Sequence, residues 1–247
     1  MNQLNLIIPA AGRGSRFSKN GIVTPKPLID LNGKPFFWWA TESVKQYIPI
    51  KELVFIVLKE HVESHQIDQK IKAYYPEANI VVIPDVTKGA AETALIGINA
   101  LSSSGPLAIN DCDHAFKFAQ PSDVQNFMQS QDEGALITFR SSKPAYSYVK
   151  FNDAKQVIGT VEKQVVSDQA IAGCYFFKDA NTYKEAYEIY IQACSYDEYF
   201  ISGLYNVLAE QDANIALFEL TDHCAFGTPP EYEAAKESIQ TYQEWIR

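Results

Sequence analysis

Two glycines and a group of cationic side chains near the start of the chain are well suited to bind a polyphosphate. Gly12 and Gly14 flank Arg13 directly after a short apolar run, so the backbone can turn sharply there. Successive N–H groups in such a turn form a concave site for anions. Residues 1–29 contain no acid and four cations, namely Arg13, Arg16, Lys19 and Lys26. This local positive charge, in a chain of formal net charge −9, indicates a phosphate-binding loop.

The spacing of this loop excludes two common nucleotide motifs. A dinucleotide fingerprint requires a third glycine where this chain has Phe17, and the G-x-x-x-x-G-K-[ST] pattern of a P-loop occurs nowhere. An ordinary strand-to-loop turn with incidental arginines is the simpler alternative. The run of unopposed cations argues against it, because a generic turn does not need them.

A pair of aspartates marks a second candidate site. Asp111 and Asp113 follow the run from Pro106 to Asn110, which has the pattern of a buried strand. Ligands of open α/β sheets bind at the carboxyl ends of strands, and Mg²⁺ typically uses one or two carboxylates plus substrate phosphates. We therefore expect a magnesium site here, the alternative being a loop with solvated acids.

Two further segments contain residues suited to ligand binding. Gly89, Ala90 and Ala91 open an expected helix, and their small size would let a flat ring pack on the backbone. A tightly packed helix start is the alternative. Glu162 and Lys163 stand at the end of an expected strand. Each of these signals is weak alone.

The elements that must position these residues alternate between strand and helix through the first half of the chain. The expected strands there are 4–8, 53–58, 79–83, 106–110 and 135–139, with helices from 35 onward and over 60–75, 89–101 and 121–131. The second half adds strands at 147–151, 157–161, 170–177 and 215–220, and helices at 183–194, 199–211 and from 229 to about 246. This order predicts one α/β domain whose sheet has an antiparallel or mixed extension.

The composition excludes several classes of partner. A net charge of −9 argues against nucleic acid and anionic membranes, which need a basic face. No apolar run approaches the roughly 18 residues of a spanning helix, and the start of the chain lacks a signal-peptide pattern. The four cysteines are dispersed without a C-x-x-C pair. We therefore expect a reduced, cytoplasmic protein.

Seven segments of the chain together resemble the nucleotidyltransferases that act on sugar 1-phosphates, also called NDP-sugar pyrophosphorylases. The segments are GRGSRF (12–17), PKPL (25–28), GAAET (89–93), NDCD (110–113), EK (162–163), AGCYFF (172–177) and FGTP (226–229). Any one of them is weak, but their order and spacing cover nearly the whole chain. The resemblance is to the short, single-domain members of the family.

The resemblance implies a fold and a reaction. The fold is a GT-A-like (Rossmann-like) three-layer α/β sandwich with a mixed, mostly parallel central sheet and an antiparallel extension. Residues 1–247 would form one nucleotidyltransferase domain, with a nucleotide-binding part over 1–140 and an acceptor-binding part over 141–247. The reaction would join an NTP and a sugar 1-phosphate with Mg²⁺, giving an NDP-sugar and pyrophosphate for surface-polysaccharide biosynthesis. A homo-oligomer is compatible with this reading.

The resemblance also implies individual roles. The nucleotide-binding residues would be Ala10, Ala11, Gly12, Arg13, Gly14, Ser15, Gly89, Ala90 and Ala91. The catalytic residues would be Arg16 at the leaving pyrophosphate, Lys26 at the α-phosphate, and Asp113, which would bind Mg²⁺ with Asp111 as a helper. The acceptor would contact Ser147, Glu162, Lys163 and Gly173, with Glu162 on sugar hydroxyls and Lys163 on the sugar phosphate.

Two positions depart from the family pattern. Ala225 stands where the family often has an aspartate as second metal ligand, so the metal would rest on Asp113 and phosphate oxygens, or Asp222 would substitute. Ser147 follows Tyr146 where the family often has glycine. Two alternatives therefore stay open: a cytidylyltransferase for a small non-sugar phosphate such as phosphocholine, and a non-catalytic nucleotide-binding protein. The sequence does not determine the base of the NTP.

Overall fold

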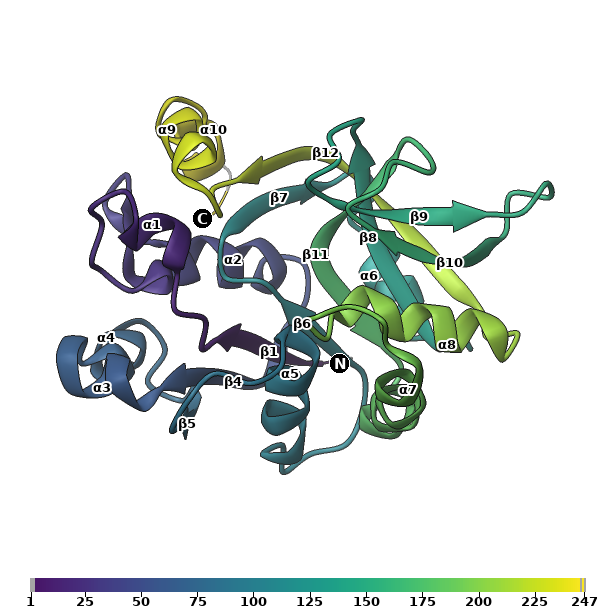
Figure 1. Cartoon of the computed structure of the whole chain (residues 1–247), viewed down its shortest axis with the longest axis horizontal. Helices are drawn as coiled ribbons and strands as arrows, with labels where there is room; N and C mark the ends of the chain where they lie inside the picture. Colours follow the sequence, from purple (N-terminus) through teal and green to yellow (C-terminus); the bar gives the residue numbers. More distant parts are fainter. Residues whose placement is uncertain (1–2, 245, 247) are drawn as a thin grey trace.

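The computed structural model describes residues 3–244 and residue 246, and its centre is a ten-stranded sheet (Figure 1). The strands of this sheet are β1 (Leu4–Ala10), β4 (Ile50–Leu58), β5 (Asn79–Ile83), β6 (Leu107–Asn110), β7 (His114–Phe118), β8 (Gly134–Arg140), β9 (Ser147–Phe151), β10 (Val157–Glu162), β11 (Gln169–Phe177) and β12 (Ile215–Ala225). A separate small hairpin consists of β2 (Asp30–Leu31) and β3 (Lys34–Pro35).

The helices fill the connections between these strands. They are α1 (Ser15–Ser18), α2 (Phe36–Lys45), α3 (Lys59–His65), α4 (Ile67–Tyr74), α5 (Ala90–Asn99), α6 (Asp123–Phe127), α7 (Ala180–Ala193), α8 (Leu204–Glu210), α9 (Pro229–Ser238) and α10 (Gln240–Gln243). Two short 3-10 helices are η1 (Lys26–Leu28) and η2 (Ile201–Gly203). None of the helices that the structure describes is long and apolar enough to cross a membrane.

The sheet is parallel on one side and mixed on the other. β1 pairs in parallel with β4 and β6, and β4 pairs in parallel with β5. β11 runs antiparallel to β6, β8 and β9, and β9 pairs with β10 as an antiparallel hairpin. β12 pairs in parallel with β8 and antiparallel with β7. This arrangement confirms the expected mixed sheet with an antiparallel extension.

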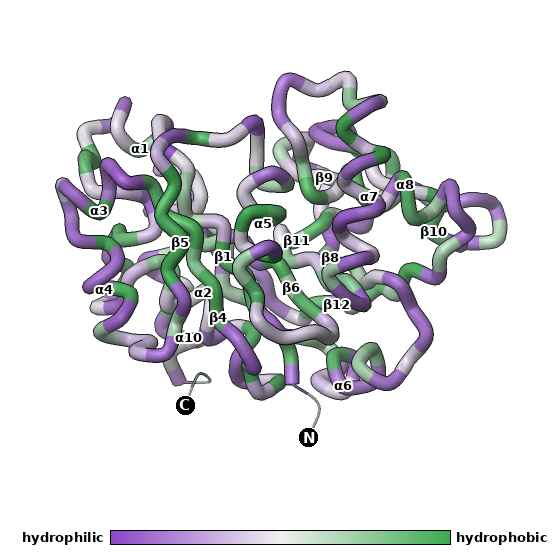
Figure 2. Tube along the Cα trace, turned by 90° about the horizontal axis from the view of Figure 1, so that it is seen from below, coloured by the Kyte–Doolittle hydropathy of each residue, from purple (hydrophilic) through white to green (hydrophobic). Residues whose placement is uncertain are grey.

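Helices cover both faces of the sheet, which gives the molecule three layers. Leu6 and Ile8 of β1 belong to a core that includes residues of α2, α4 and α6, whereas Ile7 belongs to a core with residues of α5, α7 and α8. Successive side chains of a strand point to opposite faces, so β1 supplies both cores. Figure 2 shows the hydrophobic residues concentrated along β4, β5 and β6.

A third apolar cluster fastens the first glycine loop to a late segment of the chain. Phe17, Phe36 and Phe226 are fully buried in it. The ring centroids of Phe17 and Phe36 are 5.9 Å apart, and those of Phe36 and Phe226 are 4.5 Å apart. Phe17, which replaces the third glycine of a dinucleotide fingerprint, is therefore a core residue that holds α1 beside the segment after β12.

Two expected helices differ in the structure. The helix predicted over 60–75 is divided into α3 and α4, because Gln66 adopts the left-handed conformation with φ of 53°. The helix predicted over 199–211 has its α-helical part only from Leu204. Its first residues cannot be helical, because the backbone of Tyr199 hydrogen-bonds to Lys88 and Ala91 instead.

Strand boundaries differ as well. β7 was not predicted, because its residues are almost all buried and lack the alternation that marks a half-exposed strand. β12 continues to Ala225, five residues beyond the predicted end. The final predicted helix is divided into α9 and α10, and residue 245 lies outside the described residues. All four cysteines are free.

Candidate active site

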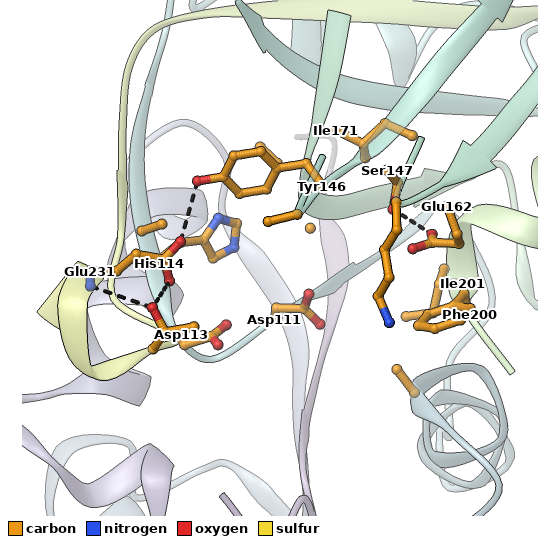
Figure 3. Close-up of a pocket in the computed structure, with 18 of the residues that line it drawn as sticks. Asp111, Asp113, His114, Tyr146, Ser147, Glu162, Ile171, Phe200, Ile201 and Glu231 are labelled. Atoms are coloured by element: carbon orange, nitrogen blue, oxygen red, sulfur yellow. Dashed lines mark hydrogen bonds between the residues drawn. The ribbon is translucent and has the colours of Figure 1, made fainter. Parts of the chain in front are cut away.

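A cavity of about 320 Å³ lies where β6, β10 and β12 reach their carboxyl ends. Open α/β sheets bind ligands at this position. Eight of the site residues predicted from the sequence line the cavity: Arg16, Ala90, Asp111, Asp113, Ser147, Glu162, Lys163 and Gly173. Figure 3 shows Asp111 near the middle, with Tyr146 and Glu231 on one side and Glu162 and Phe200 on the other.

The other predicted nucleotide-binding residues do not line this cavity; they are Ala10, Ala11, Gly12, Arg13, Gly14, Ser15, Gly89 and Ala91. The glycine loop nevertheless packs against Lys26. Gly14 has a φ of 61°, and a Cβ atom on it would lie 3.2 Å from the Cβ of Lys26. Arg13 pairs with Asp85 at 2.7 Å on the surface. Exposed ion pairs contribute little stability, so little holds Arg13 away from a phosphate.

Lys26 joins the site through an ion pair with Asp113. Its ammonium donates to Oδ2 of Asp113 at 2.8 Å, and the two side chains are 25% and 20% exposed. Burial, the largest single influence, would lower the pKa of Lys26, but the charge and hydrogen bond of Asp113, together with Cys112 and Asp111, raise that pKa overall. Burial, again the largest single influence, opposes the ionisation of Asp113, but the charge and the hydrogen bond of Lys26 act with weaker neighbouring influences and lower the pKa of Asp113 overall. Asp113 is therefore held as an anion beside a cation.

Asp111 is the second carboxylate, and it is the one that retains a proton more readily. Burial, together with the charge of Asp113, raises the pKa of Asp111 to about 7. Its backbone N–H donates to the carbonyl oxygen of Gly173 at 2.9 Å. The β11–β8 register shifts between Ile171 and Tyr175, and this irregularity brings Gly173 against Asp111. A Cβ atom on Gly173, whose φ is 72°, would lie 2.6 Å from Oδ2 of Asp111.

The segment after β12 closes on Asp113. The backbone N–H of Phe226 donates to the carbonyl oxygen of Asp113 at 2.9 Å. A Cβ atom on Gly227 would lie 2.3 Å from Oδ2 of the same aspartate. Ala225 lines the cavity, so the position that is often aspartate in the family faces the site but offers no ligand atom. Asp222 is exposed and does not line the cavity, so it does not substitute as a ligand there.

With Ala225 and Asp222 excluded as ligands, the two carboxylates of Asp111 and Asp113 suit Mg²⁺ better than zinc. Within the described part of the chain, no group of three or more His, Cys, Asp and Glu side chains could hold a metal by itself. Mg²⁺ is typically bound by one or two carboxylates and completes its coordination with water and substrate phosphates. The ionised Asp113, with Asp111 beside it and the phosphate loop nearby, fits that pattern.

Glu162 and Lys163, which the resemblance assigns to the acceptor, both line the cavity. Glu162 accepts hydrogen bonds from the hydroxyls of Ser147 and Ser202, both at Oε1. The ammonium of Lys163 lies over the ring of Phe200, 5.2 Å from its centroid. Neither Ser202 nor Phe200 was predicted, because each comes to the site from the distant segment between α7 and α8.

That segment also closes the loop before α5. The N–H of Tyr199 donates to the carbonyl oxygen of Lys88 at 2.9 Å, and the N–H of Ala91 donates to the carbonyl oxygen of Tyr199 at 3.0 Å. A Cβ atom on Gly89 would lie 2.5 Å from the backbone N and O of Tyr199, so only glycine fits there. Beside Ala90, the segment adds three residues to the cavity wall: Glu198, Phe200 and Ile201.

Two histidines, His114 buried and His223 half-buried, also line the cavity. His114 Nε2 lies 2.8 Å from Oδ1 of Asn110, and His114 Nδ1 lies 3.3 Å from Nε2 of His223. Burial lowers the pKa of His114 to about 4. Burial and the neighbouring His114 lower the pKa of His223 to about 3. Both rings are therefore neutral, with His114 donating from Nε2–H to Asn110 and accepting from Nε2–H of His223.

Tyr146 bridges the cavity wall to α9. Its hydroxyl donates to Oε1 of Glu231 at 3.3 Å, and Glu231 Oε2 accepts from the hydroxyl of Thr228 at 2.9 Å. Thr228 caps α9, as the Thr-Pro-Pro-Glu pattern predicts. The structure thus adds His114, Tyr146, His223, Phe200 and Ser202 to the residues predicted from short motifs. Phe200 and Ser202 do not stand next to any residue that the motifs singled out.

Comparison with known protein families gives a match over nearly the whole chain, and comparison with curated proteins gives matches over a shorter segment. A family model described as nucleotidyl transferase matches residues 5–241. Glucose-1-phosphate cytidylyltransferase from Salmonella typhimurium (strain LT2) is 30% identical over 67 residues, which cover 25% of this chain. The match spans about a quarter of the length of that curated relative, 26%.

Solved structures extend the similarity to almost the full chain. The nucleoside-diphosphate-sugar pyrophosphorylase from Vibrio cholerae RC9 is 27% identical and covers 94% of this chain and 99% of its own, with a TM-score of 0.81. The inositol-1-phosphate CTP transferase from T. maritima is 16% identical and covers 97% of both chains, with a TM-score of 0.74. At 16% identity, the similarity to the T. maritima structure shows a shared fold alone.

Proposed function

Because this chain belongs to the nucleotidyl transferase family, we propose that it transfers the nucleotidyl group of an NTP to a sugar 1-phosphate and releases pyrophosphate. One observation carries the proposal: a single cavity brings Arg16 and the two aspartates together with Glu162 and Lys163. The cations suit phosphates at both ends, and the carboxylate of Glu162 suits hydroxyl groups. Residues 1–140 would supply most of the nucleotide side, and residues 141–247 most of the acceptor side.

The proposed reaction needs no general base from the protein. An oxygen of the acceptor phosphate, which is already ionised near neutral pH, attacks the α-phosphorus of the NTP. A new P–O bond forms while the bond from the α-phosphorus to the oxygen bridging it to the β-phosphate breaks, and pyrophosphate leaves with that electron pair. Catalysis is then in-line positioning and stabilisation of charge.

The residues of this chain divide that work. The backbone of residues 10–15 would cradle the triphosphate, and Arg16 would hold the leaving pyrophosphate. Lys26 would hold the α-phosphate and Lys163 the acceptor phosphate. Asp113 and Asp111 would hold Mg²⁺, which when bound would offset the charge on the phosphate oxygens. We also propose that the product serves surface-polysaccharide biosynthesis in the cytoplasm, as the resemblance to short family members implies.

A second candidate acts on a different acceptor: a cytidylyltransferase for a small non-sugar phosphate, phosphocholine-like in chemistry. The lining of the acceptor side supports it. The aromatic rings of Tyr175 and Phe200 line the cavity together with the carboxylates of Glu162 and Glu198. Rings and carboxylates together would also accept an organic cation. A non-catalytic nucleotide-binding protein is the third candidate, and Ala225 in place of an aspartate is its only support.

Pyrophosphate release separates the three candidates. The protein is assayed with Mg²⁺, each of ATP, CTP, GTP, UTP and dTTP, and each of glucose 1-phosphate, inositol 1-phosphate and phosphocholine. We expect release with one base and a sugar 1-phosphate. Release with phosphocholine alone would favour the second candidate. A thermal shift with an NTP but no release with any acceptor would favour the third, since a ligand of the native state raises its stability.

A further inference from the structure

One oxygen of Glu162 is fully occupied by the protein itself. The hydroxyls of Ser147 and Ser202 both donate to Oε1 of Glu162. An ionised carboxylate has about four lone-pair sites, two on each oxygen. The two serines therefore use both sites on Oε1. Both hydrogen bonds that Glu162 accepts from described residues are at Oε1, so Oε2 is the oxygen left for a ligand.

The two serines reach Glu162 from separate elements. Ser147 on β9 is the direct cross-strand partner of Glu162 on β10. Ser202 stands in η2 and is only 1% exposed. Ser147 and Glu162 line the cavity, whereas Ser202 does not. Ser202 therefore contacts Glu162 from behind, out of reach of a ligand.

The backbone around Ser202 is fixed in turn. Its carbonyl oxygen accepts a hydrogen bond from Oγ1 of Thr160 at 2.8 Å. The N–H of Thr160 donates to Oδ1 of Asn206 at 2.7 Å, and a Cβ atom on Gly159 would lie 2.2 Å from the same Oδ1. This packing locks η2 and α8 onto β10, two residues before Glu162. The carboxylate cannot rotate without breaking two charge-assisted hydrogen bonds, which are stronger than neutral ones.

We infer that Ser147 and Ser202 are positioning residues that leave Glu162 a single oxygen for the acceptor. The inference rests on the proposed function and narrows its substrate class. The acceptor is a phosphate ester that presents one hydrogen-bond donor to Glu162, a lone hydroxyl or an ammonium group. A vicinal diol that needs both oxygens side by side is disfavoured. A protein with glycine at position 147 would lack the hydroxyl that Ser147 donates to Glu162, so one lone-pair site of Oε1 would become available to a ligand.

A double-mutant cycle tests the role of Ser202. The variants are Ser202→Ala, Glu162→Ala and the double variant, assayed with the acceptor that gives the fastest pyrophosphate release. Ser202→Ala is expected to raise the KM for the acceptor about tenfold, the loss of one hydrogen bond to a charged group, with kcat and the KM for the NTP within about twofold. In the Glu162→Ala background the same change is expected to have less than about a twofold effect.

The matched control is Ser167→Ala. Ser167 lies in the loop between β10 and β11 and donates to the carbonyl oxygen of Val149 at 2.7 Å, but it does not touch Glu162 or line the cavity. Its acceptor KM is expected to stay within about twofold of the wild type. The inference would be overturned if Ser202→Ala raised the acceptor KM equally in the wild type and in the Glu162→Ala background. The serine would then affect binding through the general stability of the structure and not through Glu162. Calorimetric titration of the same acceptor replaces KM for any variant too slow to assay.

Single-hydroxyl analogues test the substrate class when a sugar 1-phosphate is turned over. With 2-, 3- and 4-deoxyglucose 1-phosphate, the wild type is expected to lose more than about fivefold in kcat/KM at no more than one position. Ser147→Gly is expected to become sensitive at an adjacent position too. Sensitivity of the wild type at two adjacent positions overturns the single-oxygen contact. If no NTP and acceptor give pyrophosphate release, the proposed function is overturned and this inference with it. If pyrophosphate is released but Ser202→Ala leaves the acceptor KM unchanged, the inference alone is overturned.

Discussion

The ion pair of Lys26 and Asp113 is the residue-level feature on which the proposed chemistry depends. Each side chain is largely buried, and each keeps the other charged. A phosphate of an incoming NTP would compete with Asp113 for the ammonium of Lys26. Removing one partner of a largely buried pair leaves the other charge without compensation, so the two functions of Lys26, binding and charge balance, must be separated in any test.

The first prediction concerns the cations of the nucleotide side. Arg16→Ala and Lys26→Ala are each expected to lower kcat by roughly 100-fold, because each removes a positive charge aimed at developing negative charge. The measurement is pyrophosphate release at saturating NTP and acceptor. Arg16→Ala should keep the melting temperature of the wild type, whereas Lys26→Ala should lower it, because it leaves Asp113 unpaired.

Lys19→Ala is the matched control for this prediction. Lys19 belongs to the same cationic segment, but it is exposed and does not line the cavity. Its kcat should stay within about twofold of the wild type. An Arg16→Ala variant with unchanged turnover would contradict the assignment of Arg16 to the leaving group.

The second prediction separates the two aspartates. Asp113→Asn is expected to lower kcat more than Asp111→Asn does, because Lys26 holds Asp113 ionised whereas Asp111, with a pKa of about 7, carries only part of a charge near neutral pH. Both variants are assayed across Mg²⁺ concentrations, and the half-saturating Mg²⁺ should rise more for Asp113→Asn. An equal loss of kcat in the two variants, or a larger loss in Asp111→Asn, would contradict the assignment of Asp113 as the principal metal ligand.

The motifs predicted residues that line the cavity, but they missed the residues that contact those side chains from distant parts of the chain. Arg16, Asp113 and Glu162 carry local signals: a glycine turn, a strand end, an acid beside a lysine. Ser202 carries none, since it lies 40 residues from the carboxylate it contacts. His223 reaches His114 across 109 residues. Such contacts arise from strand pairing and helix docking, which a single sequence does not reveal.

At the level of elements, two glycines allow strands and loops to come within contact distance of the aspartates. Gly173 lies at the irregularity of β11 and faces Asp111, and Gly227 follows β12 and faces Asp113. They differ in conformation, because Gly173 has a positive φ and Gly227 does not. A side chain at Gly173 would both strain the backbone and displace a carboxylate, whereas a side chain at Gly227 would only displace a carboxylate. Comparing the two substitutions therefore separates the two effects.

The third prediction uses this difference. Gly227→Ala is expected to lower kcat at least about tenfold with a small effect on stability, because its Cβ would displace Asp113. Gly173→Ala is expected to lower both kcat and stability, since a left-handed non-glycine residue costs about 1–2 kcal/mol. Urea unfolding measures the stability and pyrophosphate release the activity.

Gly105→Ala supplies the control for strain alone. Gly105 has a φ of 121°, and a Cβ atom on it would have nothing within 4 Å. This variant should lose stability and keep the wild-type kcat. Full activity of Gly227→Ala would contradict the packing of Gly227 against Asp113.

Periodicity predicted most elements but not their boundaries near the site. The strands β1, β4, β5, β6 and β8 and the helix α5 stand close to their expected positions, because their apolar runs are clear. β7 is buried almost throughout, so its pattern does not differ from that of a buried loop. Residues 199 and 200, before η2, are not helical because the backbone of Tyr199 pairs with Lys88 and Ala91, and local helix propensity does not reveal such long-range pairing.

At the scale of the whole molecule, the neutral histidines should make stability depend on pH. In the unfolded chain a histidine has a pKa near 6.5, whereas folding lowers the pKa of His114 to about 4 and that of His223 to about 3. Below pH 6.5 these histidines therefore become protonated in the unfolded state while they remain neutral in the folded state. The stability is full above that pH and is lost as the pH falls toward 4.

The fourth prediction isolates one of these groups. Between pH 7.5 and pH 5.5 the wild type is expected to lose about 1.4 kcal/mol more unfolding free energy than His223→Gln, the contribution of one histidine at one pH unit below its unfolded pKa. The raised pKa of Asp111 acts in the opposite direction, but it is present in both proteins and largely cancels. The measurement is urea unfolding in the presence of EDTA. Identical pH profiles for the two proteins would contradict a His223 that is neutral in the folded state.

The overall class of the molecule followed from the sequence, but the order of its strands did not. The β/α alternation and the later run of strands predicted a mixed α/β domain, and the sheet confirms it. The insertion of β11 between β6 and β8 joins the two halves of the chain in one sheet. This pairing spans more than 60 residues between β6 and β11, so no window of the sequence shows it.

The closure of the cavity by β12 and the segment after it has a consequence for synthesis on the ribosome. Asp111 and Asp113 are translated early, but Ala225, Gly227 and Thr228, which close the cavity beside them, emerge more than 110 residues later. A nascent chain that has the glycine loop and both aspartates therefore still lacks a wall of its pocket. In the proposed reaction, nucleotide binding would therefore require β12 and the segment after it, and translation products that end before Ala225 should not bind NTPs.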